Sequence, residues 1–157
     1  MPIGVGEFMN RIKKALQRVV APPNVRLRGC TDLELARLER KFGIRLPSSY
    51  RELMRVAGKS KRVVFVGSDW TYPCVLELRD AAEMLLKECD ARLKLPKSSF
   101  VFLMHQGYSF LMFDTEAGDD PPIALFSETD PKFRIVSKAF TTWLTDALNA
   151  DSKRLRG

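Results

Sequence analysis

Apolar residues recur every three or four positions in several stretches of the chain, and this spacing places one face of a helix against a core. In the first stretch Phe8, Ile12 and Leu16 mark that face. In the second, Thr31 and Glu34 have the spacing of a capping box, in which each residue satisfies an amide at the helix start. The pattern predicts five helices: residues 5–20, 31–43, 47–58 and 81–93, and a last one that begins near Ile135.

β-Branched and aromatic residues dominate shorter stretches, which predicts strands. The two most apolar are joined by Gln106-Gly107, and a glycine at the second position of a two-residue turn is typical of a tight hairpin. The expected fold class is therefore α+β: an antiparallel sheet with flanking helices in a single domain. Because both faces of the hairpin strands are apolar, helices must cover both faces of the sheet or one face must meet a partner. The predicted strands are residues 62–67, 72–78, 100–105, 108–113 and 123–128.

The chain divides into three parts by this pattern. Residues 1–22 form an amphipathic helix that we expect to dock on the domain, although such a helix can also lie on a membrane surface. Residues 23–150 form the α+β domain, and residues 151–157 form a basic tail. The apolar runs are far shorter than the roughly 18 residues that cross a bilayer, and the first residues lack the pattern of a signal peptide. Three cysteines without a CxxC pair fit a reducing compartment, so we expect a cytoplasmic protein without a membrane span.

Charge is unevenly distributed along the chain, whose net charge is +7. Residues 1–62 hold 15 Lys and Arg against 5 Asp and Glu, a net charge of +10, whereas residues 63–157 hold 11 against 14, a net charge of −3. A basic half favours an acidic partner, such as nucleic acid, an anionic membrane or an acidic protein, or it is simply a solvated surface. No basic residue lies between Lys97 and Lys132, so the aromatic strands lack the charge of a single-strand nucleic-acid platform. Nucleic acid is therefore not the expected partner.

Motifs that would carry catalysis or bind a cofactor do not form complete sets. Gly58-Lys59-Ser60 ends like a phosphate-binding loop, but Leu53 stands at the position of that motif's first glycine and the tripeptide follows a helix. His105 is the only histidine, and a general base or a zinc site needs positioned partners. We therefore expect no enzyme activity, no catalytic residue, no metal and no cofactor.

Three groups of residues are candidates for contact with a partner. Basic side chains lie one turn apart on the outward faces of the second and third predicted helices. Aromatic residues stand in the polar loop GSDWTYP, and exposed aromatics are enriched at interfaces, although they can also plug the end of a core. Four carboxylates stand in the acidic turn DTEAGDDPP, and the two before the prolines are the candidates. A solvated turn is the alternative, and the spacing excludes an EF-hand. The candidates are Arg37, Lys41, Arg51, Arg55, Trp70, Tyr72, Asp119 and Asp120.

The segment GCTDLELARLERKFGIRLPSSYRELMRVAGKS resembles the N-terminal signature of the SUKH superfamily. The segments FVFLMHQGYSFLMFD, PPIALFSE and KAFTTWLTDAL resemble the family's remaining blocks in the same order, so that the resemblance spans roughly residues 29–148. Matches to scaffold positions of the family are Leu46, Pro47, Tyr50, Gly58 and Asp114.

This resemblance implies an α+β fold without enzymatic activity. Many bacterial members of the superfamily are immunity proteins that bind and block a cognate toxin domain, often in the cytosol, and some fungal relatives are signalling scaffolds. Inhibitors of nucleases are often acidic, so the basic half of this chain suits an acidic toxin surface or a toxin that is not a nuclease. The implied function is therefore toxin neutralisation, with a nucleic-acid-associated or regulatory adaptor as the alternative.

Overall fold

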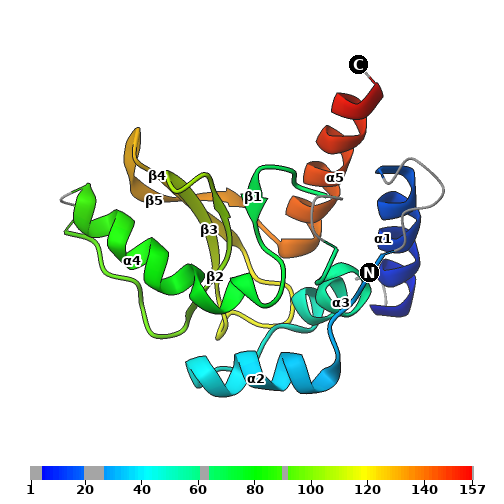
Figure 1. Cartoon of the computed structure of the whole chain (residues 1–157), viewed down its shortest axis with the longest axis horizontal. Helices are drawn as coiled ribbons and strands as arrows, with labels where there is room; N and C mark the ends of the chain where they lie inside the picture. Colours follow the sequence, from blue (N-terminus) through cyan, green and yellow to red (C-terminus); the bar gives the residue numbers. More distant parts are fainter. Residues whose placement is uncertain (1–4, 20–26, 61–63, 90–91, 157) are drawn as a thin grey trace.

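The computed structural model of the chain describes residues 5–19, 27–60, 64–89 and 92–156. These residues form the α+β class that the sequence predicts, in one domain (Figure 1). The helices are α1 (Val5–Val19), α2 (Asp32–Phe42), α3 (Ser48–Ala57), the short 3-10 helix η1 (Cys74–Glu77), α4 (Leu78–Glu88) and α5 (Phe140–Arg156). The strands are β1 (Ser68–Asp69), β2 (Ser99–His105), β3 (Ser109–Asp114), β4 (Ile123–Ser127) and β5 (Asp130–Ser137).

The strands form one antiparallel sheet in chain order, so each strand pairs with its neighbours in sequence. The β2–β3 hairpin turns at Gln106 and Gly107, whose φ angles of 49° and 78° are both positive. Such angles belong to the mirror-image turns whose twist matches that of paired strands, and they confirm the predicted hairpin. The β4–β5 hairpin is tight as well, since Ser127 pairs with Asp130. The sheet is therefore a meander with β1 and β5 at its edges.

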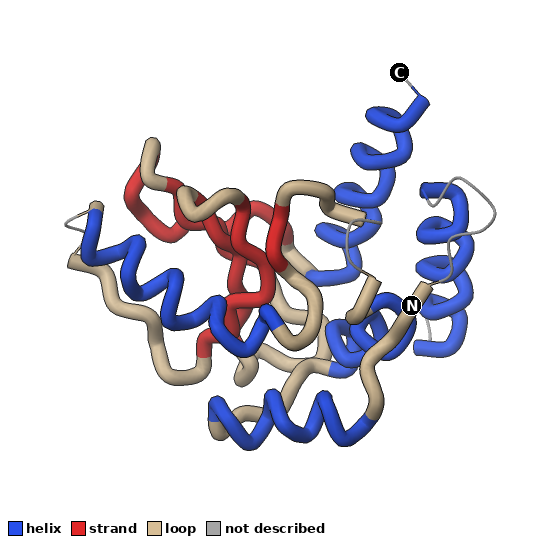
Figure 2. Tube along the Cα trace, in the orientation of Figure 1, coloured by secondary structure: helices blue, strands red, loops and turns tan. Residues whose placement is uncertain are grey.

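Helices lie on both sides of the sheet (Figure 1, Figure 2). On one side gather α1, α3 and α5, and on the other lies α4. On the side of α3 and α5, the ring of Tyr50 packs edge-on against Phe100 and Phe140, with ring centroids 5.3 Å and 5.9 Å apart. Phe113 completes this aromatic cluster at 5.4 Å from Tyr50. Edge-to-face pairs add to the gain from burying the rings, so the cluster fixes both helices on the sheet.

The two terminal helices lie side by side. α1 packs against α5 and α3 and buries Ile12 and Leu16, so its apolar face is used inside the molecule. α5 continues through Arg156, and most of the segment expected to be a basic tail is therefore helical. Among the described residues, no helix is both long and apolar enough to cross a membrane.

Two of the predicted strands are wrong. Residues 62 and 63 of the predicted strand 62–67 lie outside the described residues. Residues 64–67 are bent: Phe65 and Gly67 have positive φ angles of 54° and 88°, which an extended strand does not permit. Pairing with β2 begins after it, at Ser68. The stretch 72–78 coils into η1 and runs directly into α4, which spans Leu78–Glu88 instead of the predicted 81–93.

The predicted start of the last helix is also wrong. Ile135 and Val136 lie on β5 with 63% and 42% of their surface exposed, and α5 begins at Phe140. β-Branched residues favour strands, and Pro131 is tolerated because β5 is an edge strand. The helical spacing between Val136 and Phe140 is a coincidence across the junction of strand and helix.

Candidate functional site

Two of the predicted partner-binding cations lie on α2 and hold the segment before α4 in place. Arg37 donates a hydrogen bond from Nη1 to the hydroxyl of Tyr72 at 3.3 Å. Lys41 donates from Nζ to the carbonyl of Leu76 at 2.7 Å. Both side chains remain exposed, but each has a donor committed to this internal contact. Arg40, exposed on the same helix, forms no side-chain hydrogen bond or ion pair with another described residue.

The two predicted cations on α3 differ from each other. Arg55 is exposed and forms ion pairs with Asp32 at 3.1 Å and Glu52 at 2.9 Å, so its charge is largely balanced within the molecule. Arg51 is half-buried, and its Nε has no hydrogen-bond partner among the described residues. The four cations therefore do not form the single free basic face that their spacing suggests.

Acidic residues neutralise part of the basic half elsewhere too. Glu34 completes the capping box of α2: it accepts from the amide of Thr31 at 2.9 Å, while the Thr31 hydroxyl accepts from the Glu34 amide at 3.2 Å. Lys59 lies 3.0 Å from the same carboxylate. The hydrogen bond from the Thr31 amide, followed by that from Lys59, holds the pKa of Glu34 below its usual value.

The aromatic pair predicted as exposed interface residues is buried instead. Trp70 and Tyr72 expose 4% and 8% of their surface. The indole Nε1 of Trp70 donates to the carbonyl of Val64 at 3.1 Å, and its ring packs against Phe65 at 5.4 Å. Burial with a satisfied polar atom is how tryptophan behaves in a core. The polar loop therefore closes the end of the core, which was the alternative interpretation.

The two predicted carboxylates of the acidic turn cap helices. Asp119 accepts from the amide of Ser48 at 3.3 Å, at the start of α3, whose own N-cap, Pro47, offers no side-chain acceptor. Asp120 accepts from the amide and the hydroxyl of Thr141 at 2.9 Å and 2.6 Å, at the start of α5. Free amides at a helix start need such acceptors. The turn between β3 and β4 thus ties both helices to the sheet.

A groove lies on the same face of the sheet as α3 and α5. Along β3, Phe113, Leu111 and Ser109 alternate with residues of the other face, so all three lie on one face. Phe113 belongs to the buried aromatic cluster, but Leu111 and Ser109 lie beyond it and are only half-buried. The two helices therefore cover one half of this face and leave the other half open.

Residues in register across the strands share a face and form two rows on the open half. The first, which we call the apolar row, pairs Leu103 with Leu111 and Leu111 with Leu125. The second, which we call the polar row, follows the end of the sheet through all five strands. It consists of Ser68, His105, Ser109, Ser127 and Asp130.

The apolar row is the floor of a hollow of about 290 Å³, which we call the sheet groove. Its walls include Trp143 from α5 and Phe65 and Val66 from the bend before β1. The rings of Phe65 and Trp143 lie 5.5 Å apart, so the bend and α5 support each other there. A concave apolar surface next to hydrogen-bonding groups is the usual form of a binding site.

His105 and Ser68 are the polar groups closest to forming a reactive pair. The imidazole Nδ1 of His105 lies 2.8 Å from the hydroxyl of Ser68. Hydrolytic sites add a third group that orients the imidazole, and the ring contact of His105 here is with Tyr108, at 5.4 Å. Among the described residues no three His, Cys, Asp or Glu side chains gather as metal ligands would. The polar row is therefore equipped for hydrogen bonding to a bound group.

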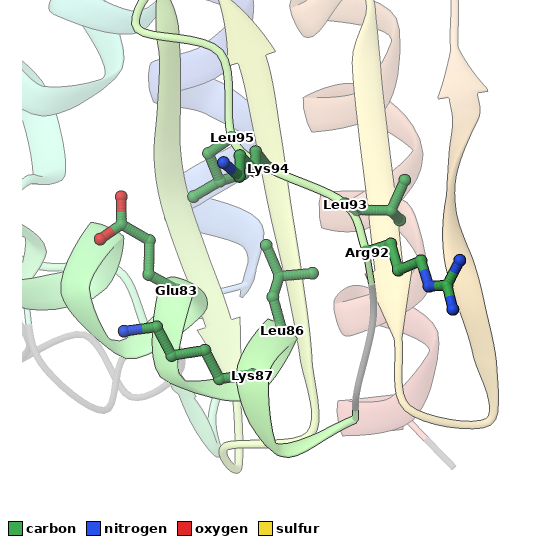
Figure 3. Close-up of a pocket in the computed structure, with 7 residues that line it drawn as sticks. All are labelled: Glu83, Leu86, Lys87, Arg92, Leu93, Lys94 and Leu95. Carbon is green, nitrogen blue, oxygen red and sulfur yellow. The ribbon is translucent and has the colours of Figure 1, made fainter.

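A second hollow, of about 380 Å³, lies between α4 and the segment that leads to β2 (Figure 3). Leu86 and Leu95 give it an apolar floor. Its charged groups do not converge: Arg92 points away from Glu83 and Lys87. One ligand group could therefore not contact Arg92 together with Glu83 or Lys87 in this hollow.

The family model of the SMI1/KNR4 family (SUKH-1) matches residues 29–146 of the chain. The chain belongs to this family. The match confirms the resemblance to the SUKH superfamily drawn from the sequence, and it includes both walls of the sheet groove. No curated protein matches this SUKH chain.

The residues that match scaffold positions of the SUKH family are mostly interior. Asp114 is the exception: it is exposed at the end of β3 and accepts from the amide of Glu116 at 2.9 Å. Leu46 and Pro47 are buried at the α2–α3 turn, Tyr50 is buried in α3, and Gly58 is buried directly after α3.

Sequence reasoning missed the sheet groove of this SUKH protein. The only signal was that the hairpin strands are apolar on both faces, which allowed an open face. Locating the opening needs the register, in which a shift between Val101 and Leu103 changes the alternation, and the reach of α5 over the sheet. Neither can be read from hydrophobic spacing.

Proposed function

We propose that this SUKH protein is an immunity protein: a non-enzymatic protein that binds a cognate toxin domain in the cytoplasm and neutralises it. The observation that carries the proposal is the family match over residues 29–146. The sheet groove supports it, since protein interfaces concentrate their binding energy in apolar pockets next to polar rims. The basic N-terminal half supports an acidic partner surface.

The test is affinity capture of the partner. The tagged chain is incubated with nuclease-treated lysate of the source cells, and bound proteins are identified by mass spectrometry. We expect one stoichiometric partner whose expression without this chain arrests growth. A tagged unrelated protein with a similar pI, near 9.5, is the control for capture by charge alone.

Other results would contradict the proposal. If the captured protein is harmless when expressed alone, the chain does not neutralise a toxin. If no protein is captured and nucleic acid co-purifies before nuclease treatment, the adaptor alternative replaces the immunity proposal.

A further inference from the structure

We propose that the sheet groove receives an apolar side chain of the protein partner, and that a carboxylate next to that side chain pairs with Arg134 on β5. This inference deepens the proposed function, because it rests on a protein partner and names the chemistry by which that partner is recognised. Its evidence is the size of the groove, the charge at one end of the apolar row and the hydrogen-bonding groups along its side.

The size of the groove suits one large side chain. Its volume of about 290 Å³ is at the low end of the roughly 300–1,000 Å³ typical of small-molecule pockets. Leu111 and Leu125 on its floor are half-buried, and Trp143 on its wall is half-buried too. An aromatic or leucine side chain would complete their burial, as anchor residues do at the centre of protein interfaces.

The apolar row ends in a positive charge. Leu125 is in register with Arg134, so the two side chains share the groove's face of the sheet. The side chain of Arg134 is 59% exposed, and its nearest carboxylate, Asp130, is 3.7 Å away. Lys132 lies 3.9 Å from the same carboxylate. Both distances exceed the roughly 2.7–2.9 Å of a direct charge-assisted hydrogen bond, so the guanidinium keeps its donors for a partner.

The polar row supplies the other contacts. The hydroxyl of Ser109 can donate and accept hydrogen bonds, and His105, whose Nδ1 meets Ser68, can donate or accept through Nε2. The Ser127 hydroxyl lies 3.0 Å from that of Thr129 and shares its capacity with that residue. They run beside the apolar row, across neighbouring strands. The backbone of a partner segment that places its apolar side chain in the groove would form hydrogen bonds with these groups. Because backbone groups are the same for every residue, these contacts do not restrict the other side chains of the segment.

The experiment needs no knowledge of the toxin. A phage-displayed library of random peptides of about twelve residues is panned against the full chain, and enriched peptides are measured by fluorescence polarisation. We expect Phe, Tyr, Trp or Leu close to Asp or Glu in the enriched sequences. Binding should also move the indole N–H signal of Trp143 in NMR spectra and leave that of Trp70, which is bonded to Val64, in place.

Matched variants locate the site. Leu125→Ser and Arg134→Glu should each weaken the enriched peptides at least about tenfold. Ile135→Ser removes an exposed apolar side chain from the opposite face of the neighbouring strand, and Arg40→Glu makes the same charge change on α2, so both should bind like the wild type. Arg134 is an exposed edge-strand residue, so its variant folds even if Leu125→Ser does not.

The results separate this inference from the proposed function. No enrichment, enrichment of basic peptides, or equal binding by Arg134→Glu would each overturn the assignment of the groove. If a toxin is captured and Arg134→Glu binds it as tightly as the wild type, the groove assignment fails and the immunity function stands. If acidic-apolar peptides bind in the groove but no toxin exists, the groove stands and the immunity function fails.

Discussion

Gly29 lies where the chain passes closest to the end of α3. The Cys30 amide donates to the carbonyl of Met54 at 2.8 Å, and this pairing holds the segment against the helix. A Cβ at Gly29 would overlap the carbonyl of Arg55, which is backbone and cannot swing aside. The glycine is required here by close approach, not by an unusual φ angle.

We therefore expect Gly29→Ala to lower the free energy of unfolding by about 1–3 kcal/mol or more, the cost of overpacking a well-filled site. Urea unfolding measures it. Gly6→Ala is the matched control: nothing lies within 4 Å of a Cβ there, and alanine favours a helix more than glycine does. Equal stability of the wild type and Gly29→Ala would show that the segment does not pack this closely.

Cys30 is the buried thiol next to this contact. Burial, with a smaller effect of the Glu34 charge, raises its pKa from 9.0 to about 11. Because the thiolate is the reactive form, we expect Cys30 to resist iodoacetamide at pH 8 in the folded protein and to react after unfolding. The half-buried Cys89 is the internal control, and peptide mass mapping gives both rates. Alkylation of Cys30 as fast as Cys89 in the folded protein would contradict its placement.

The same raised pKa has a consequence for stability. The thiol of the unfolded chain ionises first, so the contribution of Cys30 is fully present below about pH 9 and is lost as the pH rises toward 11. A Cys30→Ala variant should lose stability less steeply over this range. Identical alkaline unfolding of the two proteins would count against the shift.

At the scale of elements, α5 depends on a residue from a distant turn. Asp120 offers both carboxylate oxygens to Thr141 at the helix start. We expect Asp120→Ala to cost about 1 kcal/mol of unfolding free energy, as the loss of an N-terminal cap does, and Asp120→Asn to cost less. Asp146→Ala, which removes an exposed carboxylate within α5, is the control in the same urea titration. Equal losses for Asp120→Ala and Asp146→Ala would show that the effect is one of general charge.

Local patterns predicted the elements that local physics determines. The capping box of Thr31 and Glu34 and the hairpin at Gln106-Gly107 were predicted correctly, because each needs only neighbouring residues. The caps from Asp119 and Asp120 were not predicted, since their partners lie 71 and 21 residues away. The spacing of residues in the sequence does not show which distant residues will be in contact.

Tertiary context also decides between helix and strand in the ambiguous stretches. Val75 and Leu76 are buried in η1, as they would also be in a strand. Their apolar character is therefore compatible with a helix and with a strand. Ile135 fits the hydrophobic period of the following helix, but it lies on β5 and pairs with Ala124 of β4. For the candidate site the same limit applies: charge and aromatic content were visible in the sequence, whereas burial of Trp70 and the internal bonds of Arg37 were not.

At the scale of the whole molecule, the fold leaves one half of a sheet face open beside three packed helices. The aromatic cluster joins α3 and α5 to the sheet, α1 packs against both helices, and the sheet groove lies at the edge of this assembly. A site on rigid elements binds without a large ordering cost, which suits a tight inhibitor.

The net charge of +7 gives this molecule a long-range attraction to an acidic partner. We expect association with the captured partner to slow by about tenfold or more between low and high salt, with a smaller change in the dissociation rate. Surface plasmon resonance at several salt concentrations measures both rates, and an uncharged osmolyte at equal osmolality is the control. An association rate that is independent of salt would show that charge does not contribute to recognition of the partner.

One measurement decides most directly whether the molecule is an inhibitor. The toxic activity of the captured partner is titrated with the purified chain. We expect the activity to fall linearly to zero at about one equivalent of the chain, because binding tight enough to protect a cell leaves no free toxin. A partner that keeps its full activity in an excess of the folded chain would contradict the immunity function.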